Sequence, residues 1–303
     1  MLQILWILSL VLLVFVLFLT QKGKDPYGTF HLALNKVHED ERHPQTEWLN
    51  MGYWKNTRIF PEACQALALH LVTAAAPIAG GRVLDVGHGS GDSLLLQLSH
   101  PAIPRPSLLC GITSLSAHHI RSKQRVEDFL SSDASMRGQT RVILHQCDAV
   151  CSVDSNVEHP LSPSASDEFT TILALDCAYH FHTRFDFLQQ SYPRLAPGGR
   201  IALADICFSS SPNRFLSSLL PIIRIMPREN MITKEQYIKD LQEIGFVDIS
   251  VEDITDWVFP GFQSFLGKQG GAWKWFGRMV GWLERWKGRF VIVTAARPVY
   301  LLE

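Results

Sequence analysis

The chain has 303 residues, enough for one large domain or two small ones. Its formal net charge is −1 and 19% of its residues are charged, with no basic block, so the composition does not support a nucleic-acid partner. The six cysteines include no C-x-x-C pair, so neither a metal site of the zinc type nor a disulfide framework is indicated.

The N-terminal residues 2–19 are almost wholly apolar. As a helix they would be roughly 27 Å long, close to the hydrocarbon thickness of a bilayer. A cleavable signal peptide, the alternative, would have basic residues before the run and small residues after it, and neither is present. Lys22 and Lys24 follow the run, which by the positive-inside rule leaves the remaining chain in the cytosol. We predict a single-pass anchor over residues 1–21, with the endoplasmic reticulum as the expected membrane, and a linker over residues 22–47.

A short helix is predicted near residues 30–37, and an apolar-periodic helix over residues 61–72, where Pro61 suits the first turn. Between them lies the aromatic sequence N-M-G-Y-W at residues 50–54.

The stretch over residues 82–92 has the pattern of a strand, a glycine turn and a helix start. Val83 and Leu84 lead to Asp85, and glycines follow at positions 87, 89 and 91. This is the first unit of a nucleotide-binding α/β sheet, in which glycines let the backbone approach a ligand. The spacing is G-x-G-x-G, without the G-K-[ST] of a P-loop. A glycine turn in an unrelated sheet is the alternative.

The rest of the chain alternates between strand and helix patterns, interrupted by a loop rich in Ser, Pro and Asp over residues 153–168. Strands are predicted at 107–113, 140–149, 169–175, 201–206, 247–254 and 289–297, and helices at 116–130, 183–195 and 236–246. Gly245 is a suitable residue to end the last of these helices.

Four of these segments resemble motifs of the class I S-adenosylmethionine (SAM) methyltransferases. The glycine loop resembles their first motif. The G-I-T-S-L-S sequence at 111–116 is similar to the strand end of cyclopropane-fatty-acid-synthase-like, tocopherol-methyltransferase-like and plant alkaloid N-methyltransferase-like enzymes. Asp148-Ala149 resembles the pair that reads adenine, and L-A-P-G-G at 195–199 resembles the turn before the fifth strand. The resemblance implies a Rossmann-like α/β sheet, mostly parallel with an antiparallel last strand, in a domain over residues 48–303.

The resemblance also implies SAM as the cofactor. The three loop glycines would admit its methionine part, and Asp85 would help hold the ammonium through the loop. The N-x-G-Y-W segment is also similar to one found before the core in many small-molecule methyltransferases, in which the aromatic residues close over SAM. The alternative is that these residues cap the core. The residues concerned are Tyr53, Trp54, Asp85, Gly87, Gly89 and Gly91.

The ribose and the adenine would lie at the ends of the next two strands. The second strand ends in Thr113-Ser114, where ribose-binding sheets usually carry an acid. Thr113 and Ser114 would still flank the ribose, and Asp148 and Ala149 would read the adenine. Alternatively, Asp148 caps a turn.

Candidate catalytic residues follow the fourth strand, at the edge where open α/β sheets bind ligands. His180 is the best candidate base, because its unperturbed pKa lies near working pH. Tyr179 or Asp176 would position it, or would stabilise a cation if carbon is methylated. A structural histidine bonded to a backbone carbonyl is the alternative. His88, inside the glycine loop, is interpreted as structural.

Two inserts, near residues 212–230 and 260–288, are not needed to build the sheet. In the second, Trp275, Met279, Trp282, Leu283 and Trp286 share one helical face, away from three basic residues. This arrangement suits a helix in a membrane interface; a helix buried on the sheet or covering the pocket is the alternative.

A D-I-T…V-F-P run at 253–260 resembles tocopherol-, sterol- and sugar-methylating relatives. Together with the anchor, the inserts favour a lipophilic acceptor such as a sterol, a prenyl-quinone or another lipid. A soluble metabolite as acceptor, or a catalytically silent scaffold, are the alternatives.

Overall fold

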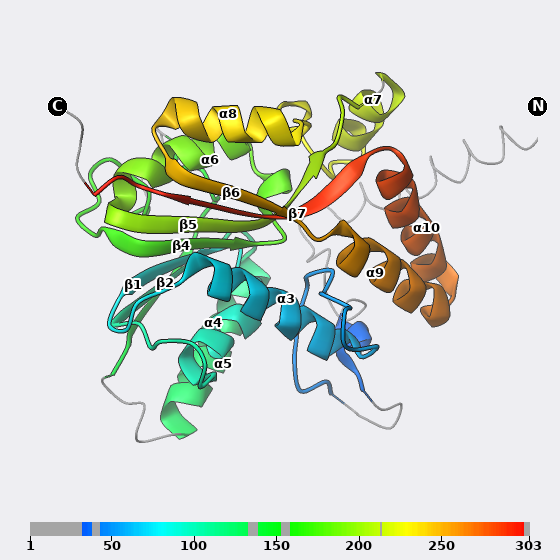
Figure 1. The fold of residues 1–303 in the computed structure, drawn as a ribbon. Coiled ribbons are helices and arrows are strands. Elements are labelled where there is room, and N and C mark those ends of the chain that lie inside the picture. Colours follow the sequence, from blue (N-terminus) through cyan, green and yellow to red (C-terminus); the bar gives the residue numbers. More distant parts are fainter. Residues whose placement is uncertain (1–31, 38–42, 133–138, 153–157, 213, 300–303) are drawn as a thin grey trace, which may run out of the picture.

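The computed structural model describes residues 32–37, 43–132, 139–152, 158–212 and 214–299 (Figure 1). The predicted anchor over residues 1–21 lies outside them, as do residues 22–31 and 38–42 of the predicted linker and residues 153–157 of the predicted loop. In the ranges that are described, every helix is too short or too polar to cross a bilayer.

The described strands form one seven-stranded sheet in the order β3-β2-β1-β4-β5-β7-β6. Strands β1 to β5 pair in parallel, and β7 is antiparallel to both β5 and β6, which confirms the predicted sheet (Figure 1). Their bounds are Arg82–Val86, Leu108–Thr113, Arg141–Gln146, Phe169–Leu175, Leu195–Phe208, Val247–Asp253 and Gly288–Ala296 for β1 to β7.

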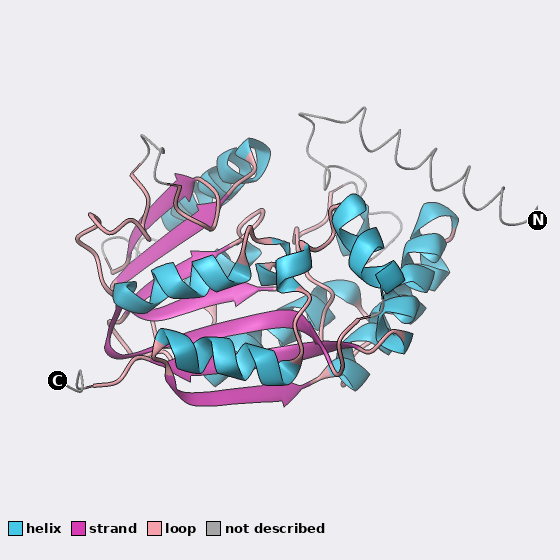
Figure 2. Ribbon diagram, turned by 90° about the horizontal axis from the view of Figure 1, so that it is seen from above, coloured by secondary structure: helices cyan, strands magenta, loops and turns pink. Residues whose placement is uncertain are grey.

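Helices cover both faces of this sheet (Figures 1 and 2). On one face lie α3 (Phe60–Ala75), α4 (Asp92–Ser99) and α5 (Ser116–Ser132); on the other lie α6 (Arg184–Ser191) and α8 (Lys234–Ile244). Leu67 and Leu71 of α3 belong to one apolar core, and Phe187 of α6 and Leu241 of α8 to the other. Because both faces are covered, the central strands are nearly continuous apolar runs.

Several helix ends follow the local sequence signals. Gly245 ends α8 with φ +107°, and its N–H donates to carbonyls of the last turn, as predicted. Thr183 caps α6 in a reciprocal capping box with Asp186.

Two local predictions differ from the structure. Of the helix expected near residues 30–37, residues 30–31 lie outside the described part, Leu32 is helical, and Ala33–Asn35 form a 3-10 turn that ends at the extended Lys36. The turn expected at 195–199 is the start of β5. Its pairing with β4 shifts between Phe169 and Thr171, and Gly198 adopts φ +77°.

The second insert forms a helical hairpin of α9 (Thr255–Gln269) and α10 (Gly271–Arg285). The sequence analysis predicted α10 and did not predict that α9 begins at Thr255. Gly288, which follows the hairpin, pairs with Phe208 at the end of β5. The hairpin therefore stands at the carboxyl edge of the parallel strands, as does α7 (Arg214–Ile222) of the first insert (Figure 1).

Candidate functional site

A cleft of about 320 Å³ opens at the carboxyl edge of the sheet, beside β1, β2 and β4. Its walls come from residues 47–50, the glycine loop, and the segments that follow β2, β3 and β4. The predicted site residues that line it are Gly87, Gly89, Thr113, Ser114, Asp148, Ala149, Asp176 and His180. The fold thus brings together residues from four separate strand ends.

The glycine loop fits tightly against its surroundings. Gly87 has φ +80°, and a Cβ there would lie 2.5 Å from Sγ of Cys177, beyond the end of β4. Gly89 has φ +56°, and its Cβ would lie 2.8 Å from Leu49 Cδ1. Gly91 (φ +99°) does not line the cleft; it precedes α4 and packs against Ser122 of α5. The loop therefore presents its backbone, without side chains at 87 and 89, to the cleft.

Asp85 lies beneath this loop and is not among the residues that line the cleft. Its Oδ2 accepts a hydrogen bond from Nε2 of Gln97 at 2.8 Å. Burial raises the pKa of Asp85 to about 6, against the opposing effect of that hydrogen bond. Its effect on a ligand would pass through the loop, as the sequence predicts.

His88 forms the wall between the loop and β2. A Cβ at Gly111 would lie 2.8 Å from His88 Cδ2, so the ring can pack here only because β2 has a glycine at that position. Nδ1 donates to the Gly89 carbonyl at 3.0 Å, and burial lowers the pKa of His88 to about 4. The residue is neutral at pH 7, in keeping with a structural role, although its ring also lines the cleft.

A histidine that the sequence analysis did not single out bonds to the backbone of the turn after β3. His159 Nδ1 accepts from the Leu161 N–H at 3.0 Å, so Nε2 carries the proton and donates to the Asp148 carbonyl at 2.9 Å. The Asp148 carboxylate is exposed in the cleft, and one of its oxygens accepts from the Val150 N–H at 3.2 Å. Asp148 therefore caps a turn and lines the cleft at the same time.

Asp176 directly follows β4, has φ +55° and lies in the cleft. Its Oδ2 accepts from the Met51 N–H at 2.7 Å, and the Tyr179 hydroxyl donates to the same carboxyl group. Burial outweighs these bonds and raises the pKa of Asp176 to about 8, so the carboxyl is protonated at pH 7. Among the described residues, Oδ1 is buried without a hydrogen-bond partner.

His180 lines the cleft at the end of a 3-10 turn, η3 (Ala178–His180). Its ring lies against the buried Tyr179 ring, 4.1 Å between centroids. Burial lowers the pKa of His180, while a hydrogen bond to the backbone of Ile225 opposes that shift. The ring is neutral at pH 7, as a base must be. It also makes the backbone contact that the alternative interpretation expected.

A buried polar network supports η3 from below, and the sequence analysis missed it. Asn230 donates to the carbonyls on either side of His180, at 3.1 and 2.7 Å, and accepts from the Arg184 N–H at 2.9 Å. Arg184 Nη1 donates to Asp205 at 2.6 Å, and the Tyr237 hydroxyl donates to the same oxygen at 2.9 Å. The available signal was Asp205, an acid inside an apolar strand, which must have a buried partner.

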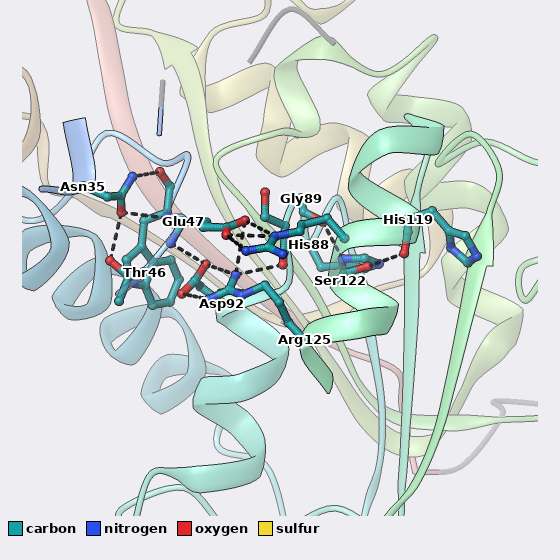
Figure 3. Close-up of polar contacts among 12 residues, drawn as sticks. Asn35, Thr46, Glu47, His88, Gly89, Asp92, His119, Ser122 and Arg125 are labelled. Atoms are coloured by element: carbon teal, nitrogen blue, oxygen red, sulfur yellow. Dashed lines mark hydrogen bonds and ion pairs between the residues drawn. The ribbon is translucent and has the colours of Figure 1, made fainter. Parts of the chain in front are cut away.

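Residues 46–54, which we call the strap, pass the other rim of the cleft, where residues 47–50 line it. Arg125 binds Asp92 through both terminal nitrogens, at 2.6 and 2.9 Å, and Asp92 Oδ2 also accepts from the Glu47 N–H at 2.9 Å (Figure 3). Arg121 Nε donates to the Glu47 carboxylate at 2.9 Å. These charged groups hold the strap against α4 and α5, beside the glycine loop.

Tyr53 and Trp54 lie in the strap but are not among the residues that line the cleft. Tyr53 meets His70 of α3 edge-on, and Trp54 packs against Phe60 and Phe265. The indole Nε1 donates to the Met51 carbonyl at 2.7 Å. These contacts match the core-capping alternative. Glu47, Trp48, Leu49 and Asn50 take the position beside the cleft instead.

Comparisons with known proteins agree with this geometry. A family model described as "Methyltransferase domain" matches residues 53–251. The chain is 29% identical to the erythromycin 3''-O-methyltransferase of Saccharopolyspora erythraea over 234 residues, which cover 72% of this chain and 68% of that protein.

Solved structures share the fold. The geranyl diphosphate C-methyltransferase of Streptomyces coelicolor has a TM-score of 0.61 at 14% identity and covers 91% of this chain and 99% of its own. A cyclopropane synthase of Mycobacterium tuberculosis has a TM-score of 0.63 at 14% identity, covering 83% and 90%.

Proposed function

The chain belongs to the methyltransferase-domain family and is a SAM-dependent methyltransferase of small molecules, and from this premise we propose that it methylates a hydroxyl group of a lipophilic acceptor at a membrane. The observation that carries the proposal is that Asp176 and His180 meet the glycine loop in one cleft. The name of the erythromycin relative, an O-methyltransferase, supports oxygen as the nucleophile.

The residues of the cleft fit the cofactor. Gly87 and Gly89 leave a surface that no side chain fills, where the methionine part would lie. Thr113 and Ser114 would flank the ribose, while the exposed Asp148 carboxylate would accept from the exocyclic amine of adenine. SAM supplies an electrophilic methyl group on a sulfonium. The protein must hold the acceptor in line with that group and exclude water.

His180 is the group that would take the proton from the acceptor hydroxyl. Its pKa is lowered by burial, so the neutral, accepting form prevails at pH 7. Asp176 is protonated at this pH and would donate a hydrogen bond, with its second oxygen held by the Met51 N–H. Tyr179 positions Asp176 through its hydroxyl.

The lipophilic acceptor and the membrane are supported by the sequence of the inserts and the N-terminus. The apolar run at 2–19 would anchor the protein, with the catalytic domain in the cytosol and the endoplasmic reticulum as its membrane. Both inserts stand at the carboxyl edge of the sheet, where the cleft opens. An acceptor dissolved in the bilayer would therefore approach the site from that edge.

A cofactor titration tests the site. The full chain in detergent should bind SAM, and Gly89→Arg should abolish binding, since the arginine would fill the cleft beside Leu49. Gly80→Arg is the matched control, because Gly80 also has a positive φ but lies exposed with nothing within 4 Å of its Cβ position. Unchanged binding by Gly89→Arg would refute the placement of the site.

A second assay tests the acceptor. The enzyme and radiolabelled SAM are incubated with a detergent-solubilised lipid extract, and label should enter the organic phase. Label that appears instead in an aqueous product separable from unreacted SAM would identify a soluble acceptor and overturn this part of the proposal.

A further inference from the structure

The outer face of α10 carries large apolar side chains that the described chain covers only in part. Trp275, Met279 and Trp282 are 55%, 39% and 50% exposed. The opposite face packs on α9 through Gly277 and Gly281, whose Cβ positions lie 3.1 and 2.6 Å from atoms of Gln263. The two glycines thus let the helices approach closely, and this packing fixes the tryptophans outward.

This concentration of exposed tryptophan is specific to the hairpin. In the described ranges, the tryptophans with large exposure are Trp257 of α9 and the two on α10. The sequence pattern had also placed Leu283 and Trp286 on this face, but both are half-buried and pack against the core. The face is therefore narrower than predicted, and its apolar residues are accessible.

The excess of positive charge on the hairpin favours an anionic partner. Residues 255–287 contain five basic and two acidic side chains, in a chain whose formal net charge is −1. The sequence analysis expected the basic residues to lie away from the tryptophan face, but the Arg278 guanidinium lies over the Trp275 ring, 4.7 Å from its centroid. The neighbouring Lys274 is exposed. Tryptophan beside cations matches the interface of a bilayer, where indole rings lie at headgroup level and basic side chains meet anionic phosphates.

We propose that the outer face of α10 inserts into the interface of a bilayer containing anionic lipids, as a membrane contact separate from the N-terminal run. The proposal rests on the membrane location in the proposed function, since the apolar residues 2–19 would hold the domain at that surface. The hairpin stands at the carboxyl edge of the sheet, so this contact brings the edge with the cleft to the bilayer.

A site-specific fluorescent label tests the contact in the full chain. Met279→Cys, labelled with an environment-sensitive dye, is reconstituted into phosphatidylcholine vesicles with and without phosphatidylserine. The control label is at Ile120→Cys on α5, which is 64% exposed on a different helix. The unsubstituted protein is labelled in parallel to subtract reaction at native cysteines.

With phosphatidylserine present, the dye at 279 should brighten several-fold and be quenched by nitroxide lipids, whereas the dye at 120 should not respond. Reversing Lys274 and Arg278 to glutamate should weaken insertion, by roughly fivefold for each positive charge lost. A dye at 279 that stays open to aqueous iodide on vesicles would overturn the proposal. So would disulfide cross-linking between 279 positions of two copies, which would assign the face to a dimer.

Two other measurements test the proposed function. Co-sedimentation with vesicles of phosphatidylcholine alone, where the face of α10 should not insert, reports on the N-terminal anchor, and label transfer to lipid in detergent reports on the acceptor. Either of these two measurements can fail while the dye at 279 still responds, so a failure of the proposed function can be told apart from a failure of the α10 contact.

Discussion

Replacing Gly87 with alanine tests whether the loop after β1 is held as tightly as its geometry indicates. Gly80→Ala is a matched control, since the two residues have φ of +80° and +71°. A Cβ at position 80 meets nothing within 4 Å, whereas a Cβ at position 87 would lie 2.5 Å from Cys177 Sγ. The pair therefore separates backbone strain from packing.

The expected magnitudes follow from these contacts. A left-handed backbone costs an alanine about 1–2 kcal/mol relative to glycine, and both variants lose this amount. At position 87 the methyl must also displace Cys177, whose thiol donates to the Val86 carbonyl at 3.2 Å. Overpacking of this kind costs about 1–3 kcal/mol more. We expect a loss of about 1–2 kcal/mol in the free energy of unfolding for Gly80→Ala and about 2–5 kcal/mol for Gly87→Ala.

Urea unfolding and SAM titration provide the two measurements. Gly80→Ala should leave cofactor affinity unchanged, whereas Gly87→Ala should weaken it about tenfold or more, since a displacement costing about 1.4 kcal/mol in the cleft wall suffices. Adding Cys177→Ala to Gly87→Ala removes the sulfur and should restore the packing part of the stability loss only. Equal losses at 80 and 87, or normal cofactor affinity in Gly87→Ala, would contradict the close fit of the loop against β4.

Three further outcomes are expected. The folded Asp176 has a pKa of about 8, against about 3.9 in the unfolded chain, so between these values the folded protein keeps a proton that the unfolded chain releases. Its contribution to stability therefore falls as pH rises from 4 to 8, and Asp176→Asn should flatten the plot of Tm against pH; an unchanged slope would contradict the shift. His180→Ala should lower kcat by about 10²–10⁴-fold with SAM affinity intact, and a rate loss of less than threefold would remove His180 as the base. Because burial lowers the pKa of His180, the midpoint of the acid decline in the wild-type rate should lie below the ordinary histidine value. Arg125→Met leaves the buried Asp92 unpaired, so urea titration should show about 3 kcal/mol less stability, together with weaker SAM binding as the strap loosens.

The sheet could be predicted because its signals are local. The apolar runs of β1 and β4 lie next to the glycine loop and Asp176 in sequence, and Gly245 marks the end of α8 by itself. Parallel strands bring their carboxyl ends to one edge, so assigning the strands placed Thr113 and Asp148 in the cleft without further information.

The strap could not be predicted, because its contacts join distant parts of the chain. Arg121 and Glu47 are separated by 74 positions, and Asp176 and Met51 by 125. The helix and strand periods of a sequence give no information on contacts between residues so far apart in the chain. The side chain of Trp54 illustrates the consequence: the motif suggested a ligand contact, but Phe265, which packs against it, comes from α9, which was not predicted.

The orientation of α10 against the rest of the protein could not be predicted from the sequence either. Helical periodicity correctly put Trp275 and Trp282 on one side, but periodicity does not say which side meets the protein. The deciding feature is Gly277 and Gly281, which admit α9 closely. In a sequence, glycines inside a helical pattern indicate only a low helix propensity.

The strap also links the two halves of the cleft. Through Glu47 it is held to Asp92 beside the glycine loop, and through the Met51 N–H it bonds the Asp176 carboxyl at the other end of the site. That bond lowers the pKa of Asp176 and so opposes the effect of burial. Because the strap residues between these two bonds line the cleft, we expect a cofactor that tightens the strap to tighten the bond to Asp176 as well. The expected result is that SAM binding lowers the pKa of Asp176 through the strap backbone, before any acceptor arrives.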